Sequence, residues 1–282
     1  MNRGNASRPG SAGDAGRPAH GVGLVDDATS GPAGSPGLLT RASRAQGTSG
    51  PVLLAVAHGS RDPAAQACVG ALASRVRRLT GGAGVRVAFV QHARPLLAEA
   101  LAGAATEVGA DRVFIVPLLL STGYHLTVDI ATAAARGGAP VAGPLGPDAR
   151  LVPALAARLA EAGAPDGTPV VLAAAGSSDP AAAVDARRQA SLLAGRLRAP
   201  VAAAFASAAS PTVDEAVAGL ATRTGRPVAV ATYLLAPGLF HGRLRHSGAA
   251  WVSEPLGDHP AVARLVADRF RAVAGTALYQ AA

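Results

Sequence analysis

The two halves of this chain repeat one another, and this repeat constrains the fold more than any other feature. The segment 52–63 (VLLAVAHGSRDP) aligns with 171–180 (VLAAAGSSDP), and 113–123 aligns with 228–238. The aligned segments keep their order and nearly the same spacing, which chance matching in an Ala-rich sequence does not produce. Self-similarity over such a long period predicts two homologous lobes in tandem.

Each half alternates short apolar runs with longer amphipathic segments. The run 52–57 is continuously apolar, as expected of a strand covered on both faces, and Asp62 followed by Pro63 predicts the start of a helix. Strands alternating with helices predict an α/β fold in which each lobe is a parallel sheet flanked by helices. In the first half we expect strands at 52–57, 85–90, 113–120 and 140–143, and helices after Pro63 and at 95–108, 128–135 and 149–162.

Three segments of different character divide the chain. Residues 1–50 are rich in Gly, Ser, Pro, Ala and Arg and have no helical or strand period, which predicts a disordered N-terminal extension. We expect the first lobe at 51–163 and the second lobe at 168–275, joined by a linker rich in Gly and Pro. A single cleft is expected between the two lobes.

Two absences in the sequence exclude whole classes of chemistry. All 26 basic residues are Arg, so no lysine is available for a Schiff base or a phosphate-binding loop. Cys68 is the single cysteine, which excludes intrachain disulfides and cysteine-ligated metal clusters in a monomer. The sequence also offers no long apolar run and no secretory leader, so we expect a cytoplasmic protein without membrane contact.

The formal net charge of +8 raises the question of an anionic partner. The Arg residues are scattered, and aromatic residues make up only 3% of the chain, which argues against nucleic acid. A diffuse excess of Arg is usually a solvated surface. The other interpretation is a small polyanionic substrate, because Arg binds carboxylates in a bidentate manner.

Three polar side chains follow three expected strands of the first lobe: His58, Gln91 and His125. Ligands of parallel α/β sheets bind beyond the carboxyl ends of the strands, so these side chains should converge there. The residues aligned with them in the second half mostly lack a side chain that could bind a metal or a proton. Gln91 aligns with Ala206 or Ser207. A lone loop histidine is usually structural, but two at one sheet edge could hold a metal, move protons, or both.

The motifs around these two histidines resemble those of a known family. AHGSRDP at 57–63 and VPLLLSTGYHLTVDI at 116–130 are similar to the small class II tetrapyrrole chelatases, and within them to the sirohydrochlorin chelatases. The second half is similar as well, with YLLAPGLFHGRL at 233–244. The resemblance spans about residues 52–272 and matches the double-length form of the family.

The resemblance implies two chelatase-like lobes and an enzyme that inserts a divalent metal, Fe²⁺ or Co²⁺, into sirohydrochlorin. The product would serve sirohaem or cobalamin synthesis. His58 and His125 match the family's paired histidines, so they would receive the metal and assist deprotonation of the pyrroles. The metal is then a substrate, no tightly bound cofactor is expected, and we expect a monomer with one metal site on the first lobe.

Gln91 departs from the family pattern, in which an acidic residue stands at this position. An amide cannot take up a proton, although its oxygen can orient a histidine or weakly bind a metal. Gln91 is a candidate catalytic residue, and the departure weakens the case for a proton relay more than the case for metal docking. The adjacent His92 could substitute, but successive residues of a strand point to opposite faces, which predicts that it points away.

Further candidates could bind the carboxylates or the flat ring of the substrate. Each has a structural alternative: a loop serine caps helices, an arginine belongs to a solvated surface, and an aromatic ring packs in a core. His241 is the second-lobe residue best placed to contribute across the cleft. The substrate-binding candidates are Ser60, Arg61, Tyr124, His241 and Arg243.

Two other functions stay open from the sequence. A tetrapyrrole or metal carrier that binds without catalysis would explain Gln91 and the missing second site. A phosphate-recognising α/β enzyme could use the loop at 58–60 at a helix N-terminus, although the Gly-rich phosphate motifs are missing.

Overall fold

The structure is a computed structural model that describes residues 50–123 and 125–280. The chain divides into Met1–Gln46 and Gly47–Ala282, and every helix and strand described below belongs to the second unit. The predicted N-terminal extension, except Gly50, lies outside the described residues, as does Tyr124.

The first lobe is built on a parallel sheet with the strand order β2-β1-β3. Strands β1 (Val52–Ala57), β2 (Gly84–Phe89) and β3 (Val113–Pro117) all run in the same direction. All six residues of β1 are buried, as its continuously apolar sequence predicts for a central strand covered on both faces. The expected strand at 140–143 is only a single bridge, which pairs Val141 with Ile115.

Helix α1 (Pro63–Arg77) begins where the sequence predicts. The Asp62 side chain accepts a hydrogen bond from the Ala64 backbone N–H, and Pro63 occupies the first turn. The buried face carries Val69, Leu72 and Val76. The other helices of this half are α2 (Leu97–Val108) and α3 (Ala131–Gly137), and a π-helical turn (His125–Ile130) precedes α3.

The second lobe repeats this arrangement with the strand order β5-β4-β6-β7. All its strand pairs are parallel, and helices follow each of the first three strands. Two parallel sheets flanked by helices confirm the predicted fold class. The elements are β4 (Val170–Ala174), α5 (Pro180–Leu197), β5 (Val201–Phe205), α6 (Val213–Thr224), β6 (Ala229–Tyr233), α7 (Leu239–Leu244) and β7 (Trp251–Val252).

The repeat extends to the backbone of the loops after β1 and β4. Gly59 and Gly176 both have positive φ angles, +100° and +91°. A Cβ atom would lie 1.7 Å from the Gln91 carbonyl oxygen at Gly59, and 1.8 Å from the Ser207 carbonyl oxygen at Gly176. Both loops therefore need glycine, and Ser207 is the structural counterpart of Gln91.

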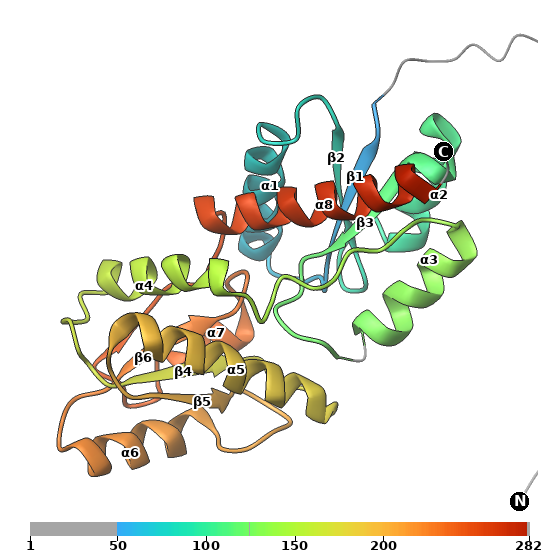
Figure 1. The fold of residues 1–282 in the computed structure, drawn as a ribbon. Helices are drawn as coiled ribbons and strands as arrows, with labels where there is room; N and C mark the ends of the chain where they lie inside the picture. The colour runs from blue at the N-terminus through green and yellow to red at the C-terminus, as the bar shows by residue number, and fades with distance from the viewer. Residues whose placement is uncertain (1–49, 124, 281–282) are drawn as a thin grey trace, which may run out of the picture. The chain divides into compact units, whose positions relative to one another are not determined.

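The last helix of each half packs against the sheet of the other half (Figure 1). Helix α4 (Val152–Glu161) belongs to the first half of the sequence but contacts β6 and α5. Helix α8 (Pro260–Gln280) ends the second half but lies on α1 and β3. The two lobes in space therefore differ from the predicted lobes, 51–163 and 168–275, by these two exchanged helices.

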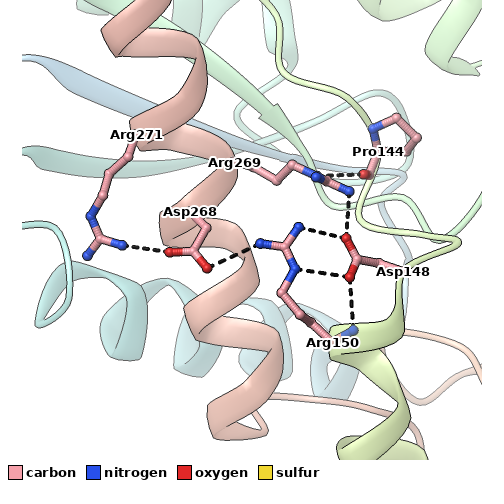
Figure 2. A network of polar contacts seen from close by, with 6 residues as sticks. All are labelled: Pro144, Asp148, Arg150, Asp268, Arg269 and Arg271. Carbon is pink, nitrogen blue, oxygen red and sulfur yellow. Dashed lines mark hydrogen bonds and ion pairs between the residues drawn. The ribbon is translucent and has the colours of Figure 1, made fainter.

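Polar contacts tie α8 to the segment that precedes α4 (Figure 2). The Asp148 carboxylate accepts hydrogen bonds from Arg150 at 2.7 Å and from Arg269 at 3.0 Å. Arg150 also contacts the Asp268 carboxylate at 3.3 Å. Burial opposes ionisation of Asp148, but the two arginines outweigh burial and hold the pKa of Asp148 below its usual value.

One hydrophobic core runs through both lobes because of the exchange. Phe270 of α8 is 5% exposed and meets Phe114 of β3 edge-on, with ring centroids 5.8 Å apart. Both residues belong to a cluster that also contains buried residues of β4 and α5. None of the helices in the described part of the chain has the length and apolarity needed to cross a membrane.

Candidate functional site

Loops from the carboxyl ends of both sheets line a cavity of about 1080 Å³. This is the edge of a parallel sheet where the topology collects ligand-binding loops. Its walls are largely apolar, with a small number of polar side chains among them. Four segments provide most of the lining: 57–62, 118–123, 174–178 and 233–241.

His58 follows β1 directly, and both of its ring nitrogens have partners. Its Nδ1 lies 3.1 Å from the Gly59 carbonyl oxygen, and its Nε2 lies 3.0 Å from the Gln91 side-chain nitrogen. A carbonyl oxygen only accepts, so Nδ1 carries the proton and Nε2 accepts from the Gln91 amide. The only lone pair of the neutral ring is therefore at Nε2.

Gln91 reaches His58 from a neighbouring cavity of about 650 Å³, which it lines together with residues of α2 and α3. The hydrogen bond between His58 and Gln91 thus lies where the two cavities adjoin. The structure brings these two predicted residues together, and it gives Gln91 a positioning contact.

His92 also lies beside His58, contrary to the prediction that it points away. The two ring centroids are 6.0 Å apart, and His92 lines the larger cavity. The alternation of strand residues does not apply, because β2 ends at Phe89 and His92 has a φ angle of +63°. The polar residues before Pro95 are typical of a loop, and this pattern could have indicated that the strand ends before His92.

His125 begins the π-helical turn that follows the loop after β3. Its backbone is thus joined to the same sheet edge as His58, and Gly123, two residues earlier, lines the larger cavity. The side chain of His125 lies outside the described part of the structure. The meeting of the two imidazoles therefore stays a prediction.

The loop that leads to His125 is held by the second lobe. The buried Tyr233 hydroxyl donates to the Leu120 carbonyl oxygen at 2.7 Å, and burial raises the pKa of Tyr233 far above its usual value. The Asp185 carboxylate accepts from both the backbone N–H and the hydroxyl of Thr122, each at 2.7 Å. The second lobe thus fixes the loop that carries a first-lobe candidate.

Ser60 and Arg61 both line the larger cavity. The Ser60 hydroxyl accepts from the N–H of Asp62, the residue that caps α1, at 3.0 Å, so Ser60 holds the loop and does not itself cap the helix. Ser177 makes the same contact with Asp179 in the second lobe, at 3.1 Å. Arg61 is exposed at the cavity.

His241 lies on α7 and lines the larger cavity, although it is only 4% exposed. Its Nε2 is 3.8 Å from the Glu254 carboxylate and has no hydrogen-bond partner among the described residues. Burial lowers the pKa of His241, with Glu254 opposing and Arg245 adding to the effect. Arg243 is exposed, its guanidinium 6.0 Å from the centre of the Phe240 ring.

The nitrogen-bearing side chains of His58 and Gln91 have no nitrogen-bearing counterparts in the second lobe. Ala175 and Ser207 occupy the places of His58 and Gln91, and the Ser207 hydroxyl donates to the Ala175 carbonyl oxygen at 2.9 Å. Within the parts of the chain that the structure describes, no group of three or more His, Cys, Asp or Glu could hold a metal. Two adjacent imidazoles, His58 and His92, are the donors seen together.

The CbiX family model matches the chain twice, at residues 52–162 and at residues 169–273. Among curated proteins, the sirohydrochlorin cobaltochelatases of Methanosarcina acetivorans and Methanosarcina barkeri are 35% and 33% identical, each over 78 residues. Each match covers 28% of this chain and 59% of the relative. This chain therefore spans less than two thirds of the length of these relatives.

Two solved structures of SirB are also similar. SirB from Bacillus subtilis with Fe³⁺ has a TM-score of 0.70 and 26% sequence identity, covering 82% of this chain and 98% of that chain. The sirohydrochlorin chelatase SirB from Bacillus subtilis subspecies spizizenii, in complex with cobalt, has a TM-score of 0.68 and 25% identity over the same shares. These comparisons confirm the resemblance drawn from the sequence motifs. The chain belongs to the CbiX family, in a double-length form with one family domain in each half.

Proposed function

We propose that this protein inserts a divalent metal, Fe²⁺ or Co²⁺, into sirohydrochlorin. The observation that carries the proposal is the exposed imidazole of His58 at the carboxyl edge of the first sheet, where a backbone carbonyl fixes Nδ1 as the donor. Nε2 then carries the lone pair of the ring, which accepts from the Gln91 amide here and which a metal ligand requires. The similarity to sirohydrochlorin chelatases supports this macrocycle as the partner of the metal.

The reaction exchanges one metal ion for two protons. The divalent ion enters the ring, the two pyrrole N–H groups each lose a proton, and the charge of the macrocycle is unchanged. His58 is proposed to hold the incoming metal at Nε2 and, once the metal has left, to accept one proton there. His125, which follows the loop after β3, is proposed as the second dock and proton acceptor.

Gln91 is proposed to position His58 and not to act as a base. Its amide donates to His58 Nε2, so the amide group has to turn away before a metal can bind that atom. Because an amide takes up no proton, the acidic residue of the family pattern has no equivalent at this position. Proton transfer is therefore assigned to the imidazoles of His58 and His125.

The larger cavity is proposed to hold the macrocycle. Its apolar walls suit a flat conjugated ring, and Arg61 at its edge suits the acidic side chains of the substrate. Ser60, Tyr124, His241 and Arg243 remain candidates for substrate contact. Among them, Ser60 and His241 line the same cavity as Arg61.

The test is an anaerobic assay of purified full-length protein with sirohydrochlorin and either Fe²⁺ or Co²⁺, followed by the absorbance of the macrocycle. We expect insertion well above the uncatalysed rate with at least one metal. His58→Ala and His125→Ala should each lower the rate by about 100-fold or more, the usual contribution of a positioned acid or base. His246→Ala is the matched control, because His246 is exposed on the second lobe and outside the residues that line the cavity.

No rate above the uncatalysed one with either metal would overturn the proposal. Stoichiometric binding of sirohydrochlorin without turnover would instead support the carrier interpretation. Faster insertion of iron would point to sirohaem synthesis, and faster insertion of cobalt to cobalamin synthesis. Affinity alone does not decide between the metals, because it rises along the first-row series for most donor sets.

A further inference from the structure

We infer that His92 is a further ligand of the substrate metal, beside His58 in the dock that the proposed function assigns to His58 and His125. The inference rests on the proposed function for the presence of a metal, and it extends that function to a residue outside the family motifs matched in the sequence. It is carried by the position of the two rings at the edge of one cavity.

The separation of the two rings suits a shared ion. Their centroids are 6.0 Å apart, and the ring planes are tilted by 44°. Two imidazoles that each bind one first-row metal at about 2.1 Å have ring centres about 5–6 Å apart. Both side chains are exposed, so rotation about their side-chain bonds is open to them.

The backbone explains why His92 reaches this place. Strand β2 ends at Phe89, and the φ angle of +63° at His92 turns the chain out of the extended conformation. A non-glycine residue in this region is uncommon and marks a position held by its surroundings. The side chain therefore lies on the same side as His58, where a strand residue would have pointed away.

The second lobe repeats the backbone but not the side chains. Ala208 has the same left-handed conformation as His92, with a φ angle of +54°, and Ala175 stands in the place of His58. The loop geometry is thus a property of the fold and does not require histidine. Both imidazoles occur together in one lobe and are both replaced by alanine in the other.

The donors of this dock are uncharged, which suits an ion that has to leave. Gln91 stands where the family pattern has a carboxylate, so this position places a neutral amide beside the imidazoles. Neutral nitrogen donors bind divalent first-row metals without cancelling their charge. The ion keeps its attraction for the acidic macrocycle and is released to it more readily than from a carboxylate.

The test measures Co²⁺ binding to the metal-free, full-length protein in the absence of sirohydrochlorin, by calorimetry and by the visible absorption of the bound ion. We expect His92→Ala to raise the Kd for Co²⁺ at least about tenfold and to weaken the visible bands, since even outer partners of a metal site contribute 10–100-fold. His246→Ala should leave both unchanged. Ala208, at the equivalent position of the second lobe, shows that this backbone conformation accommodates alanine. An unchanged Tm of His92→Ala would establish that the variant folds.

An unchanged Kd and an unchanged spectrum in folded His92→Ala would overturn the inference. His92→Asn provides a second variant, because asparagine tolerates left-handed backbone and lacks the imidazole; it should weaken binding as alanine does. The outcomes stay distinct from those of the insertion assay. If His92→Ala binds Co²⁺ more weakly but the wild type inserts no metal, His92 is a metal ligand and the proposed function is wrong. If the wild type inserts metal but His92→Ala binds Co²⁺ normally, the proposed function holds and His92 is not a ligand.

Discussion

At the scale of single residues, Gly59 is a position of the site that has no room for a side chain. It lies between His58 and Ser60, has a φ angle of +100°, and approaches the backbone of Gln91 so closely that no Cβ fits. Any side chain must either move the Gln91 carbonyl or distort the loop after β1. The glycine therefore sets the distance at which His58 meets Gln91.

We predict that Gly59→Ala lowers the free energy of unfolding by about 2–4 kcal/mol, because left-handed strain adds to a steric clash with backbone. Urea unfolding measures the effect, and the insertion rate should fall as well. Gly143→Ala is the matched control: the described residues leave open space at that position, so its effect should stay within about 0.5 kcal/mol. Equal urea midpoints for the two variants would contradict the prediction.

His241 links stability to pH. Burial lowers its pKa, so the folded protein resists protonation of a ring that the unfolded chain protonates near the usual pKa of 6.5. Its contribution to stability is therefore present above pH 6.5 and is lost as the pH falls towards the lower pKa of the folded state. Between pH 7.5 and pH 5.5 the free energy of unfolding of the wild type should decrease.

His241→Asn should show a smaller decrease over the same pH range, because the titrating group is gone. Denaturant unfolding at several pH values gives both slopes. His259, whose pKa is also lowered by burial, contributes equally in the two proteins and cancels from the comparison. Parallel pH profiles of the wild type and the variant would rule out this role of His241.

The sequence predicted some site residues better than others, for a physical reason. His58 and Gln91 were predicted to converge because strand ends in a parallel sheet share one edge, and the structure brings their side chains together. His92 was wrongly predicted to point away, because the strand was taken to run to residue 90. The positive φ angle at His92 depends on the surrounding fold, which a periodicity in the sequence does not contain.

At the scale of helices and strands, the pattern of apolar residues predicts that an element is buried but not which neighbour covers it. The helix expected at 149–162 exists as α4 after one short turn, yet it packs on the sheet of the other half. The segment 144–148 before it is held to α8 by tertiary contacts, which a sequence pattern does not contain (Figure 2).

Phe270 on α8 tests this exchange. Phe270→Ala should lower the free energy of unfolding by about 3–5 kcal/mol, the usual loss for a large buried aromatic side chain. Val184→Ala on α5 is the control, because Val184 is 61% exposed and should cost less than about 0.5 kcal/mol. Urea unfolding followed by far-UV circular dichroism measures both.

The single tryptophan adds a second readout to this experiment. Trp251 lies on β7 in the second lobe, whereas Phe270 packs on the sheet of the first lobe. Because the exchanged helices join both lobes in one core, tryptophan fluorescence and circular dichroism should shift together in Phe270→Ala. A shift in circular dichroism with unchanged fluorescence would mean that the lobes unfold separately.

At the scale of the whole molecule, the repeat in the sequence predicted the duplicated α/β architecture. The similarity of the two halves can be read from the sequence even where the exact ends of the strands cannot. The sequence could not show how the halves share one core. That sharing gives the second lobe a part in the site although it lacks the histidines: Tyr233 and Asp185 hold the loop that leads to His125. After the duplication, one lobe thus carries His58 and His92, and the other carries side chains that hold the loop before His125.

The positive charge of the whole molecule bears on how an anionic substrate reaches the cavity. With a formal net charge of +8 and no lysine, the protein should attract a polycarboxylate macrocycle over distances longer than a contact. Raising the salt from about 0.05 M to about 0.5 M shortens the screening length several-fold, so the KM for sirohydrochlorin should rise while kcat changes little. Arg61→Gln should raise KM up to about fivefold, as expected for an exposed ion pair, and should reduce the dependence on salt. Arg188→Gln on the exposed face of α5 is the control: it should change neither KM nor its salt dependence, because Arg188 is not among the residues lining the cavity. If KM is independent of salt in the wild type and in both variants, contacts within the cavity and not long-range charge bring in the substrate.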